Sequence, residues 1–353
     1  MRILIATDAW TPQVNGVVRS LQHTAREAKK LGADIEFMTP GDFRTVPMPT
    51  YPEVRLALAT RAMVARRMDK IGADFVHIAT EGPVGMLARS VCLSRDQIFT
   101  TSYHTRFPEY LAARAPVPQA LSYAFLRRFH NAGAGIMVST PTLEAELRGR
   151  GFHNIVRWSR GVDAELFRPR TAEEIDDATL AALPRPIFLF VGRVAVEKNI
   201  GAFLDLDLPG TKVVVGDGPS RKELEAAYPQ AKFLGMREGE ALAKVYSSAD
   251  VFVFPSLTDT FGIVLLEALA SGVPVAAFPV TGPTDVIGSA PPDAPVGRLD
   301  TDLRRAALGA LEISRTDARD FALRHSWRAC TEQFLSNINA AQAMSVRTAA
   351  KTA

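Results

Sequence analysis

Residues 256–283 read SLTDTFGIVLLEALASGVPVAAFPVTGP, and the pattern of their side chains decides the fold. The apolar run just before them, residues 250–255, has the length and the aromatic and β-branched content of a buried strand. From Phe261 apolar side chains recur at three- and four-residue spacing until Gly272-Val273-Pro274, which predicts a helix with a stop signal. Residues 275–278 form a second apolar run. The order strand, helix, strand predicts one parallel crossover unit.

Polar residues occur where the first of these strands ends and the helix begins. Asp259 and Thr260 lie at this junction, and we expect the side chains of residues 258–260 to cap the helix. Open α/β sheets bind ligands at this edge, and a helix amino end favours a phosphate. Glu267 lies about two turns along an otherwise apolar helix, where a buried carboxylate needs a partner. The alternative is an ordinary helix with a capping Asp259 and a solvated Glu267.

Length and composition indicate a globular chain of two domains. The 353 residues are 47% hydrophobic and 22% charged, which is typical of folded proteins. Cys92 and Cys330 are far apart and lack CxxC spacing, so neither a disulfide framework nor a zinc site is expected. The first residues read as a strand rather than a signal peptide, and no apolar run approaches the ~18–20 residues of a membrane-spanning helix. We therefore expect a cytoplasmic protein, soluble or peripheral to a membrane.

The net charge of +3 conceals a difference between the two halves of the chain. Residues 1–170 carry 23 Lys and Arg against 15 Asp and Glu, whereas the remainder carries 18 against 23. A basic first half and an acidic second half predict two domains with different partners. The basic half suits an anionic membrane surface. Nucleic acid is not expected as a partner, because the sequence has no aromatic-interleaved basic motif and no zinc finger.

Short apolar strands alternate with helical segments along the chain, which predicts an α/β protein with two doubly wound parallel sheets. A polar stretch rich in Asp, Glu and Pro interrupts this alternation before residue 187. We expect a first domain at 1–168, a linker at 169–186, a second domain at 187–326, and a final helix with a frayed tail at 327–353. The expected strands are 2–6, 34–38, 54–58, 75–78, 98–101, 136–139, 187–191, 212–215, 232–234, 251–254 and 275–278.

Loops that follow expected strands of the first domain carry polar residues at the edge where ligands bind. The first of these loops opens a helix, so its amides are placed for a phosphate, but the sequence there lacks GxGxxG and is unlike that of a dinucleotide dehydrogenase. His77 lies within an apolar strand and is predicted to be a hydrogen-bonded core residue. The candidate site residues in the loops are Asn15, Gly16, Glu81, Tyr103 and His104.

Two loops of the second domain carry cations and glycines directly after strands. Residues 191–199, VGRVAVEKN, place Arg193 and Lys198 where two cations can converge on one anion. The alternative for Lys198 is a solvated surface lysine. Gly192 and Gly216 lie in turns that follow strands, and neither turn has the third glycine of a dinucleotide fingerprint.

Asp259, seven intervening residues and Glu267 resemble the acidic-x7-Glu motif of retaining glycosyltransferases of the GT-B fold, in the large family four that uses nucleotide sugars. The resemblance spans nearly the whole chain and is closest to bacterial enzymes that glycosylate diacylglycerol or related lipids. It implies two Rossmann-like domains that face a cleft, with the C-terminal helix crossing back to the first domain. The first acidic residue is Asp here rather than the commoner Glu, so the identity of the donor sugar stays open.

The resemblance also implies a role for each motif. Arg193 and Lys198 would neutralise the leaving diphosphate, which is the work of a metal ion in other transferases. Asp259 and His104 would orient the sugar, and Glu267 would hold the ribose. No metal and no cofactor is implied beyond the UDP- or GDP-linked sugar itself. The implied donor-binding residues are Asn15, Gly16, Gly192, Gly216, Thr260, Phe261, Gly262 and Ile263, and the implied acceptor-binding residues are Glu81 and Tyr103.

The implied reaction is metal-independent transfer of a hexose-type sugar, with retained anomeric configuration, to a lipid acceptor such as diacylglycerol. An expected helix at 118–131 would rest on anionic headgroups at the inner face of the cytoplasmic membrane, or would simply pack its apolar face on the core. Two further functions stay open: the same chemistry on a soluble glycan or small-molecule acceptor, and a catalytically silent sugar-nucleotide-binding protein. The retention of Arg193, Lys198, Asp259 and Glu267 argues against the silent protein.

Overall fold

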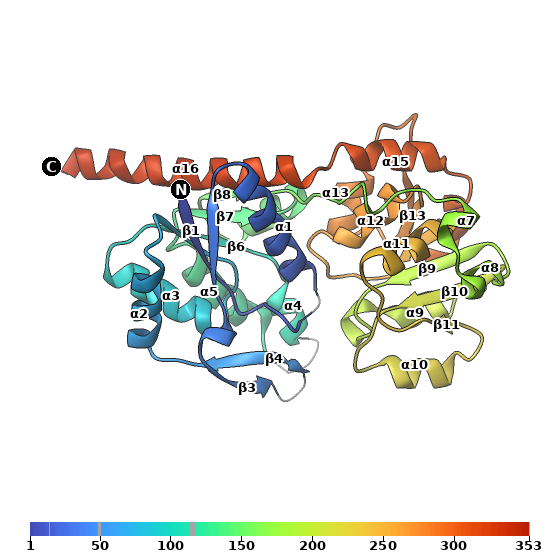
Figure 1. Cartoon of the computed structure of the whole chain (residues 1–353), viewed down its shortest axis with the longest axis horizontal. Helices are drawn as coiled ribbons and strands as arrows, with labels where there is room; N and C mark the ends of the chain where they lie inside the picture. Colours follow the sequence, from blue (N-terminus) through green and yellow to red (C-terminus); the bar gives the residue numbers. More distant parts are fainter. Residues whose placement is uncertain (14, 49–50, 113–116, 353) are drawn as a thin grey trace. The chain divides into compact units, whose positions relative to one another are not determined.

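The computed structural model describes residues 1–13, 15–48, 51–112 and 117–352 (Figure 1). The chain divides into two compact units, the first formed by Met1–Ser159 with Trp327–Ala353 and the second by Arg160–Ser326. Each unit is built on a six-stranded sheet whose neighbouring strands are all parallel. The predicted α/β class with two doubly wound parallel sheets is confirmed.

The sheet of the first unit contains β1 (Arg2–Ala6), β2 (Asp34–Met38), β5 (Phe75–Ile78), β6 (Phe99–Ser102), β7 (Gly135–Val138) and β8 (Ile155–Arg157). Their spatial order is β2-β1-β5-β6-β7-β8. Every residue of β5, β6 and β7 is buried. Strand β7, with the sequence GIMV, is apolar throughout, whereas β5 buries a histidine and β6, with the sequence FTTS, buries three hydroxyl side chains. The order of the strands reverses between β1 and β5, so the loops after these two strands flank the switch point of this sheet.

Between β2 and β5 the chain forms a separate antiparallel pair of strands, β3 (Arg44–Met48) and β4 (Tyr51–Leu58). Only the end of β4 was predicted. The sequence of β3, RTVPM, contains Arg and Pro and is only partly buried, so it lacks the apolar run that identifies a central strand.

The helices of the first unit connect its strands, and the C-terminal helix returns to it. Helix α16 (Trp327–Thr352) packs against α1 (Gly16–Lys30), where the rings of Trp327 and His23 stack with centroids 4.7 Å apart. The predicted return of this helix is confirmed. The helix continues to Thr352, and fraying of its end stays a prediction. The other helices are η1 (Pro40–Asp42), α2 (Arg61–Ile71), α3 (Pro83–Ser94), α4 (Phe107–Ala112), α5 (Gln119–His130) and α6 (Pro141–Gly149).

The sheet of the second unit contains β9 (Ile187–Val191), β10 (Thr211–Val215), β11 (Lys232–Phe233), β12 (Val251–Phe254), β13 (Val275–Ala277) and β14 (Gly297–Leu299). Their order, β11-β10-β9-β12-β13-β14, reverses between β9 and β12. All residues of β9, β12 and β13 are buried, as their apolar sequences predicted. Strand β14 was not predicted, since its three residues include a glycine and an arginine and form no apolar run.

The helices of the second unit are short. They are α7 (Ala172–Ile175), α8 (Ala178–Ala181), η2 (Val196–Lys198), α9 (Ile200–Leu204), α10 (Arg221–Ala227), α11 (Gly239–Ser248), α12 (Ile263–Ala270), α13 (Thr281–Ile287), α14 (Leu303–Ala310) and α15 (Arg315–Leu323).

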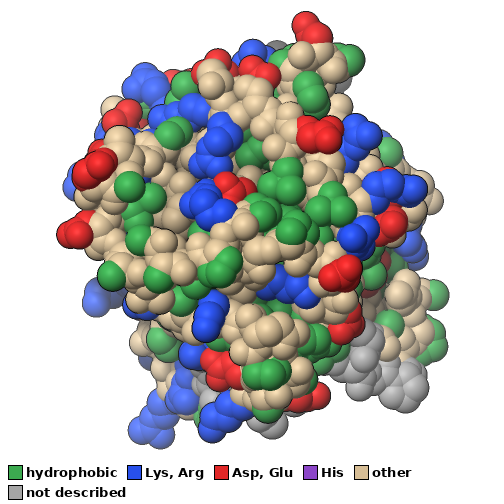
Figure 2. All heavy atoms as spheres, turned by 90° about the vertical axis from the view of Figure 1, so that its right-hand side faces the viewer, with side chains coloured by type: hydrophobic (Ala, Val, Ile, Leu, Met, Phe, Trp, Pro, Cys, Tyr) green, Lys and Arg blue, Asp and Glu red, His purple; other side chains and the backbone are tan. Residues whose placement is uncertain are grey.

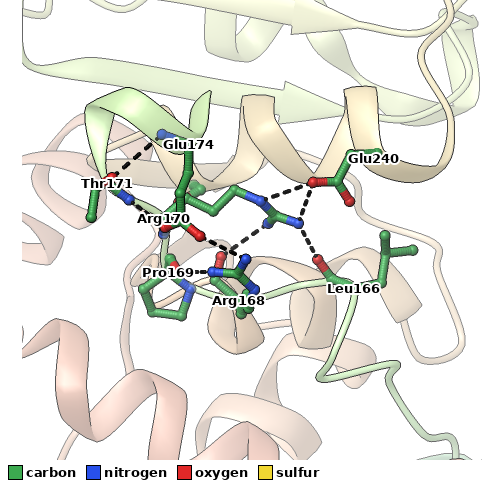
Figure 3. Close-up of polar contacts among 8 residues, drawn as sticks. Leu166, Arg168, Pro169, Arg170, Thr171, Glu174 and Glu240 are labelled. Carbon is green, nitrogen blue, oxygen red and sulfur yellow. Dashed lines mark hydrogen bonds and ion pairs between the residues drawn. The ribbon is translucent and has the colours of Figure 1, made fainter. Parts of the chain in front are cut away.

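The stretch predicted to be a linker, 169–186, lies inside the second unit, and the division of the chain falls earlier, between Ser159 and Arg160. Leu180 and Leu183 of this stretch belong to the buried core of the second unit. Arg170 fixes its beginning: the guanidinium donates to the Leu166 and Arg168 carbonyls and to Glu240 of α11 (Figure 3). The polar composition of 169–186 predicted a solvated linker. The prediction is wrong because the few apolar side chains of this stretch pack in the core of the second unit.

Arg170→Ala should destabilise the second unit, whereas Arg168→Ala should leave the free energy of unfolding nearly unchanged. The Arg170 side chain is 2% exposed, and its removal leaves two backbone carbonyls without their donor, at a cost of about 1–3 kcal/mol. Arg168 pairs with Glu174 at the surface, where ion pairs contribute little. Chemical denaturation of the two variants measures the difference, and equal losses would contradict the anchoring role of Arg170.

Candidate active site

Lys198 and Asp259 form an ion pair at the switch point of the second sheet. Lys198 ends η2 in the loop that follows β9, and Asp259 lies in the loop between β12 and α12. The Lys198 Nζ atom is 2.6 Å from Asp259 Oδ1 and 2.9 Å from Oδ2. Both side chains remain partly accessible, at 20% and 16% exposed. Two residues separated by 61 positions thus meet where α/β sheets bind ligands.

Two further hydrogen bonds tie the same loops together. The side-chain amide of Asn199 donates to the Pro255 carbonyl at 3.0 Å, and the Ser256 hydroxyl donates to the Glu197 carbonyl at 3.5 Å. Asn199 has a left-handed backbone, with φ 52° and ψ 36°, which asparagine tolerates better than most residues. This conformation turns the chain from η2 into α9 directly after Lys198. Asn199 was not predicted as a site residue, although its type is typical of such a turn.

Glycines allow the neighbouring loops to approach this site. A Cβ atom on Gly216 would lie 1.9 Å from the Gly192 carbonyl oxygen, and one on Gly218 would lie 2.4 Å from the Val194 carbonyl oxygen. The Gly192 amide donates to the Val215 carbonyl, and the Val194 amide donates to the Asp217 carbonyl. The loops after β9 and β10 are therefore held backbone to backbone. Arg193 lies between Gly192 and Val194 in this rim and is partly exposed.

The amino end of α12 differs from the prediction. The helix begins at Ile263 rather than Phe261, and its N-cap is Gly262, in a left-handed conformation with φ 83°. The N-cap glycine has no side chain to make a capping hydrogen bond, and capping by residues 258–260 stays a prediction. The Asp259 carboxylate is bound to Lys198, and the ring of Phe261 is buried. Thr260, Gly262 and Ile263 are partly exposed beside it.

Glu267 lies on the buried side of α12, 3% exposed, and its Oε2 atom accepts a hydrogen bond of 2.9 Å from the Tyr246 hydroxyl of α11. The expectation that this carboxylate needs a partner is confirmed. Its predicted contact with a ribose remains a prediction.

The candidate residues of the first unit lie around the carboxyl ends of its own strands. The Asn15 Oδ1 atom accepts hydrogen bonds of 3.0 Å from both the Val17 and Val18 amides, so Asn15 is the N-cap of α1, which begins at Gly16. Two amides expected to face a phosphate are thus occupied by this side chain. Val14 of the same motif lies outside the described residues.

His104 follows β6 and is partly exposed, with its ring edge-on to Trp158 at a centroid distance of 5.7 Å. The adjacent Tyr103 is 1% exposed and packs in the core near Phe152 and His130. Burial raises the pKa of the Tyr103 phenol above its usual value. This packing does not favour the predicted contact of Tyr103 with an acceptor, and it leaves His104 as the accessible member of the pair.

A buried histidine holds Glu81. The His130 ring is fully buried, with Nε2 3.0 Å from Glu81 Oε1 and Nδ1 2.9 Å from the Thr101 hydroxyl. An ionised carboxylate only accepts hydrogen bonds. In the hydrogen bond to an ionised Glu81, the His130 Nε2–H group is therefore the donor. Glu81 itself keeps a side-chain exposure of 19%. His130 was not predicted, because its helix position gives no sign that it faces the loop after β5.

Asp8 closes the amino end of α3. Its carboxylate accepts hydrogen bonds from the Val84 amide at 2.8 Å, the Gly85 amide at 3.2 Å and the Thr80 hydroxyl at 3.0 Å. Desolvation raises the pKa of the Asp8 carboxyl above its usual value, against the opposing effect of these hydrogen bonds. Asp8 was not predicted as a site residue. The prediction that His77 is a core histidine is confirmed, since it is fully buried between the Thr100 and Ser102 hydroxyls.

No cluster of three or more His, Cys, Asp or Glu side chains within the described ranges could hold a metal ion.

Comparisons with known proteins agree with this geometry. The family model Glycosyltransferase Family 4 matches residues 14–166, and Glycosyl transferases group 1 matches residues 185–294. A GDP-mannose-dependent alpha-mannosyltransferase of Mycobacterium tuberculosis is 33% identical over 312 residues, which cover 81% of each chain. An alpha-monoglucosyldiacylglycerol synthase of Acholeplasma laidlawii is 25% identical, covering 78% of this chain and 79% of the relative. The crystal structure of Anabaena HepE with UDP and glucose is similar with a TM-score of 0.73 at 14% identity, covering 96% of this chain and 100% of that one.

The two Rossmann-like units form the GT-B fold that these structures share. The chain belongs to glycosyltransferase family four. It is a hexosyltransferase that uses a nucleotide sugar.

Asn199→Ala should lower kcat by about tenfold, because a displaced left-handed turn would shift Lys198 relative to its substrate. Asn154→Ala is a matched control: Asn154 is also left-handed, with φ 54°, and also donates its amide to a backbone carbonyl, that of Gly133. Both variants should lose similar stability, of about 1 kcal/mol, from alanine in this conformation. Thermal unfolding and steady-state kinetics on both variants separate the two effects.

Asn199→Gly should recover part of the lost kcat, because glycine adopts the left-handed turn without strain but lacks the amide. Equal kcat values for the Asn199→Ala and Asn154→Ala variants would show that Asn199 does not position the site.

Proposed function

We propose that this enzyme transfers a hexose from a UDP- or GDP-sugar bound by the second unit to a lipid acceptor, such as diacylglycerol, bound by the first. Anomeric configuration would be retained and no metal ion would take part. The observation that carries the proposal is the pairing of Lys198 with Asp259 at the switch point of the second sheet. The Lys198 ammonium group can bind a diphosphate, and the Asp259 carboxylate can accept hydrogen bonds from sugar hydroxyls.

The helix ends support the assignment of the donor to the second unit. In the first unit, Asn15 caps α1 and the Asp8 carboxylate accepts from amides at the start of α3. A diphosphate at either end would compete with an oxygen that the chain itself supplies. In the second unit, the N-cap of α12 is Gly262, which has no side chain and leaves room for a ligand to approach.

Charge stabilisation in the second unit would replace a metal ion. Lys198 and Arg193 would neutralise the diphosphate as the sugar departs, and preorganised cations of this kind supply a large share of catalysis. Asp259 is engaged by Lys198, and Glu267 is buried against Tyr246, so neither carboxylate is presented as a nucleophile. We therefore favour attack on the same face as the leaving group, with the departing phosphate accepting the proton of the acceptor hydroxyl.

The first unit offers a carboxylate for the acceptor. Glu81 lies in the loop after β5 at the switch point of its sheet, and the buried His130 holds one of its oxygens. A carboxylate fixed in this way can accept a hydrogen bond from an acceptor hydroxyl without paying to reorganise. His104, the accessible histidine after β6, would complete the site from the first unit.

A surface of α5 supports a lipid acceptor. The helix buries Tyr123, Leu126 and Phe129 in the core of the first unit, yet Leu121 and Phe125 on another face are 65% and 44% exposed. These two side chains are four residues apart and therefore adjacent on the helix. Arg127 and Arg128 follow on the same helix, where each basic residue near an anionic surface contributes about 1 kcal/mol.

The exposed apolar side chains of α5 are the basis for the proposed attachment at the inner face of the cytoplasmic membrane. In the described ranges no helix combines the length and the hydropathy needed to cross a bilayer. On the face of the second unit in Figure 2, Lys and Arg side chains are interspersed with Asp and Glu, without a large area of one sign. The relative from Acholeplasma laidlawii is an alpha-monoglucosyldiacylglycerol synthase, which is why diacylglycerol is our first acceptor.

Purified enzyme incubated with UDP- and GDP-sugars and with diacylglycerol should produce a glycolipid with an α-linked sugar when the donor is α-linked. GDP-mannose is the first donor to test, because the relative from Mycobacterium tuberculosis depends on it. Lys198→Ala should reduce turnover by about 10²-fold or more, since it removes charge stabilisation of the leaving group. Product analysis by mass spectrometry and NMR measures both results.

Product formed only on soluble glycans would contradict the lipid acceptor but keep the transferase chemistry. An inverted product would contradict the same-face mechanism. Dependence on added divalent metal ions would contradict the proposed role of the two cations.

Binding to vesicles that contain anionic lipid should fall when Leu121 and Phe125 are both changed to Gln, and the binding of the unchanged enzyme should fall with salt. Leu323→Gln is the matched control, because Leu323 is a 50% exposed leucine of the second unit. Flotation of the three proteins with vesicles gives the bound fractions. Equal loss in the control, or no binding at any salt concentration, would remove α5 as the membrane contact.

A further inference from the structure

Lys198, the cation assigned to the diphosphate, already has an anionic partner within the chain. Both carboxylate oxygens of Asp259 lie within 2.9 Å of Nζ. The pair is only partly exposed, so water screens it less than it would a surface ion pair. A diphosphate that approaches Lys198 must therefore share the ammonium group with a carboxylate of the same sign as itself.

The loops that carry the pair limit how this conflict can be relieved. Asn199 ties the loop after β9 to the Pro255 carbonyl, and Ser256 ties the loop after β12 to the Glu197 carbonyl. Asn199 and Glu197 flank Lys198 directly, and Pro255 and Ser256 precede Asp259 in the loop after β12. The two loops are thus tied together where they leave the sheet, and rearrangement of the two side chains is the simplest way to relieve the conflict.

The intact donor and the spent nucleotide then differ in what they offer Asp259. The sugar of the donor has hydroxyl groups that can donate to the carboxylate and satisfy it while Lys198 holds the diphosphate. After transfer the sugar is gone, and the carboxylate faces an anion without a donor. Two anions that share one ammonium group repel each other, and the arrangement that relieves the repulsion is the ion pair between Lys198 and Asp259.

We propose that Asp259 competes with the diphosphate for Lys198, so that return of the ion pair weakens the binding of the nucleoside diphosphate product and promotes its release. The inference rests on the proposed function, in which Lys198 holds the diphosphate. Asp259 thereby has two roles: it contacts the sugar before transfer and displaces the product afterwards. Release of product limits turnover in many enzymes, so this competition would raise kcat if release limits turnover here.

Asp259→Asn should therefore bind the nucleoside diphosphate more tightly than the unchanged enzyme, by about fivefold or more, while its transfer activity falls. Isothermal titration calorimetry with UDP and with GDP measures the dissociation constants. Product inhibition constants from kinetics should change in the same direction. Tighter binding by the variant also shows that it is folded.

Asp250→Asn is the matched control. Asp250 precedes β12, at the opposite end of the strand from Asp259, and it pairs with Arg185 at 2.5 Å. This variant changes the net charge by the same amount and also breaks an ion pair, but it does not touch Lys198. Its affinity for the nucleoside diphosphate should equal that of the unchanged enzyme.

Lys198→Ala should bind the nucleoside diphosphate more weakly, and adding Asp259→Asn to it should tighten binding less than it does in the unchanged enzyme, because the competition for the ammonium group needs both partners. If Lys198→Ala binds normally, the proposed role of Lys198 fails. If Lys198→Ala binds weakly but Asp259→Asn does not tighten binding, or Asp250→Asn tightens it equally, the competition alone is overturned.

Discussion

The ion pair between Lys198 and Asp259 depends on the order of the strands in the second sheet. The chain leaves β9 toward β10 and β11 and later returns to the other side of β9 as β12. The carboxyl ends of β9 and β12 are therefore neighbours, and the loops that follow them leave the sheet side by side. Charges separated by 61 residues in the sequence come within hydrogen-bond distance only because of this reversal.

The rim around this pair is rigid because its contacts are made by backbone atoms. The positions of Gly216 and Gly218 exclude any side chain, since a Cβ atom at either would overlap a carbonyl oxygen of the loop after β9. Asn199 adds a side-chain bond across the switch point. Catalysis by fixed charges requires this kind of support, because charges that must reorganise during the reaction stabilise a transition state less well.

The two units have the same sheet architecture, but the side chains at their switch points differ. In the first unit, the side chains of Asp8 and Asn15 accept from amides at helix ends, and a buried histidine holds Glu81. In the second unit, a cation and a carboxylate face each other beside a helix whose N-cap is a glycine. The same kind of sheet thus carries, in one unit, carboxylate and amide oxygens that accept hydrogen bonds and, in the other, the site that we propose for a diphosphate. Function in this fold resides in the loops rather than in the strands.

The sequence by itself determined the two parallel sheets and most of their strands, because strands buried on both faces are continuous apolar runs. It also singled out Lys198, Asp259 and Glu267, whose residue types and spacing match a known motif. Only the tertiary structure decided that Lys198 binds Asp259, that His130 binds Glu81, and that 169–186 packs inside the second unit. The physical reason is that a local pattern records whether a residue is buried, whereas its partner depends on the order in which distant strands lie beside one another.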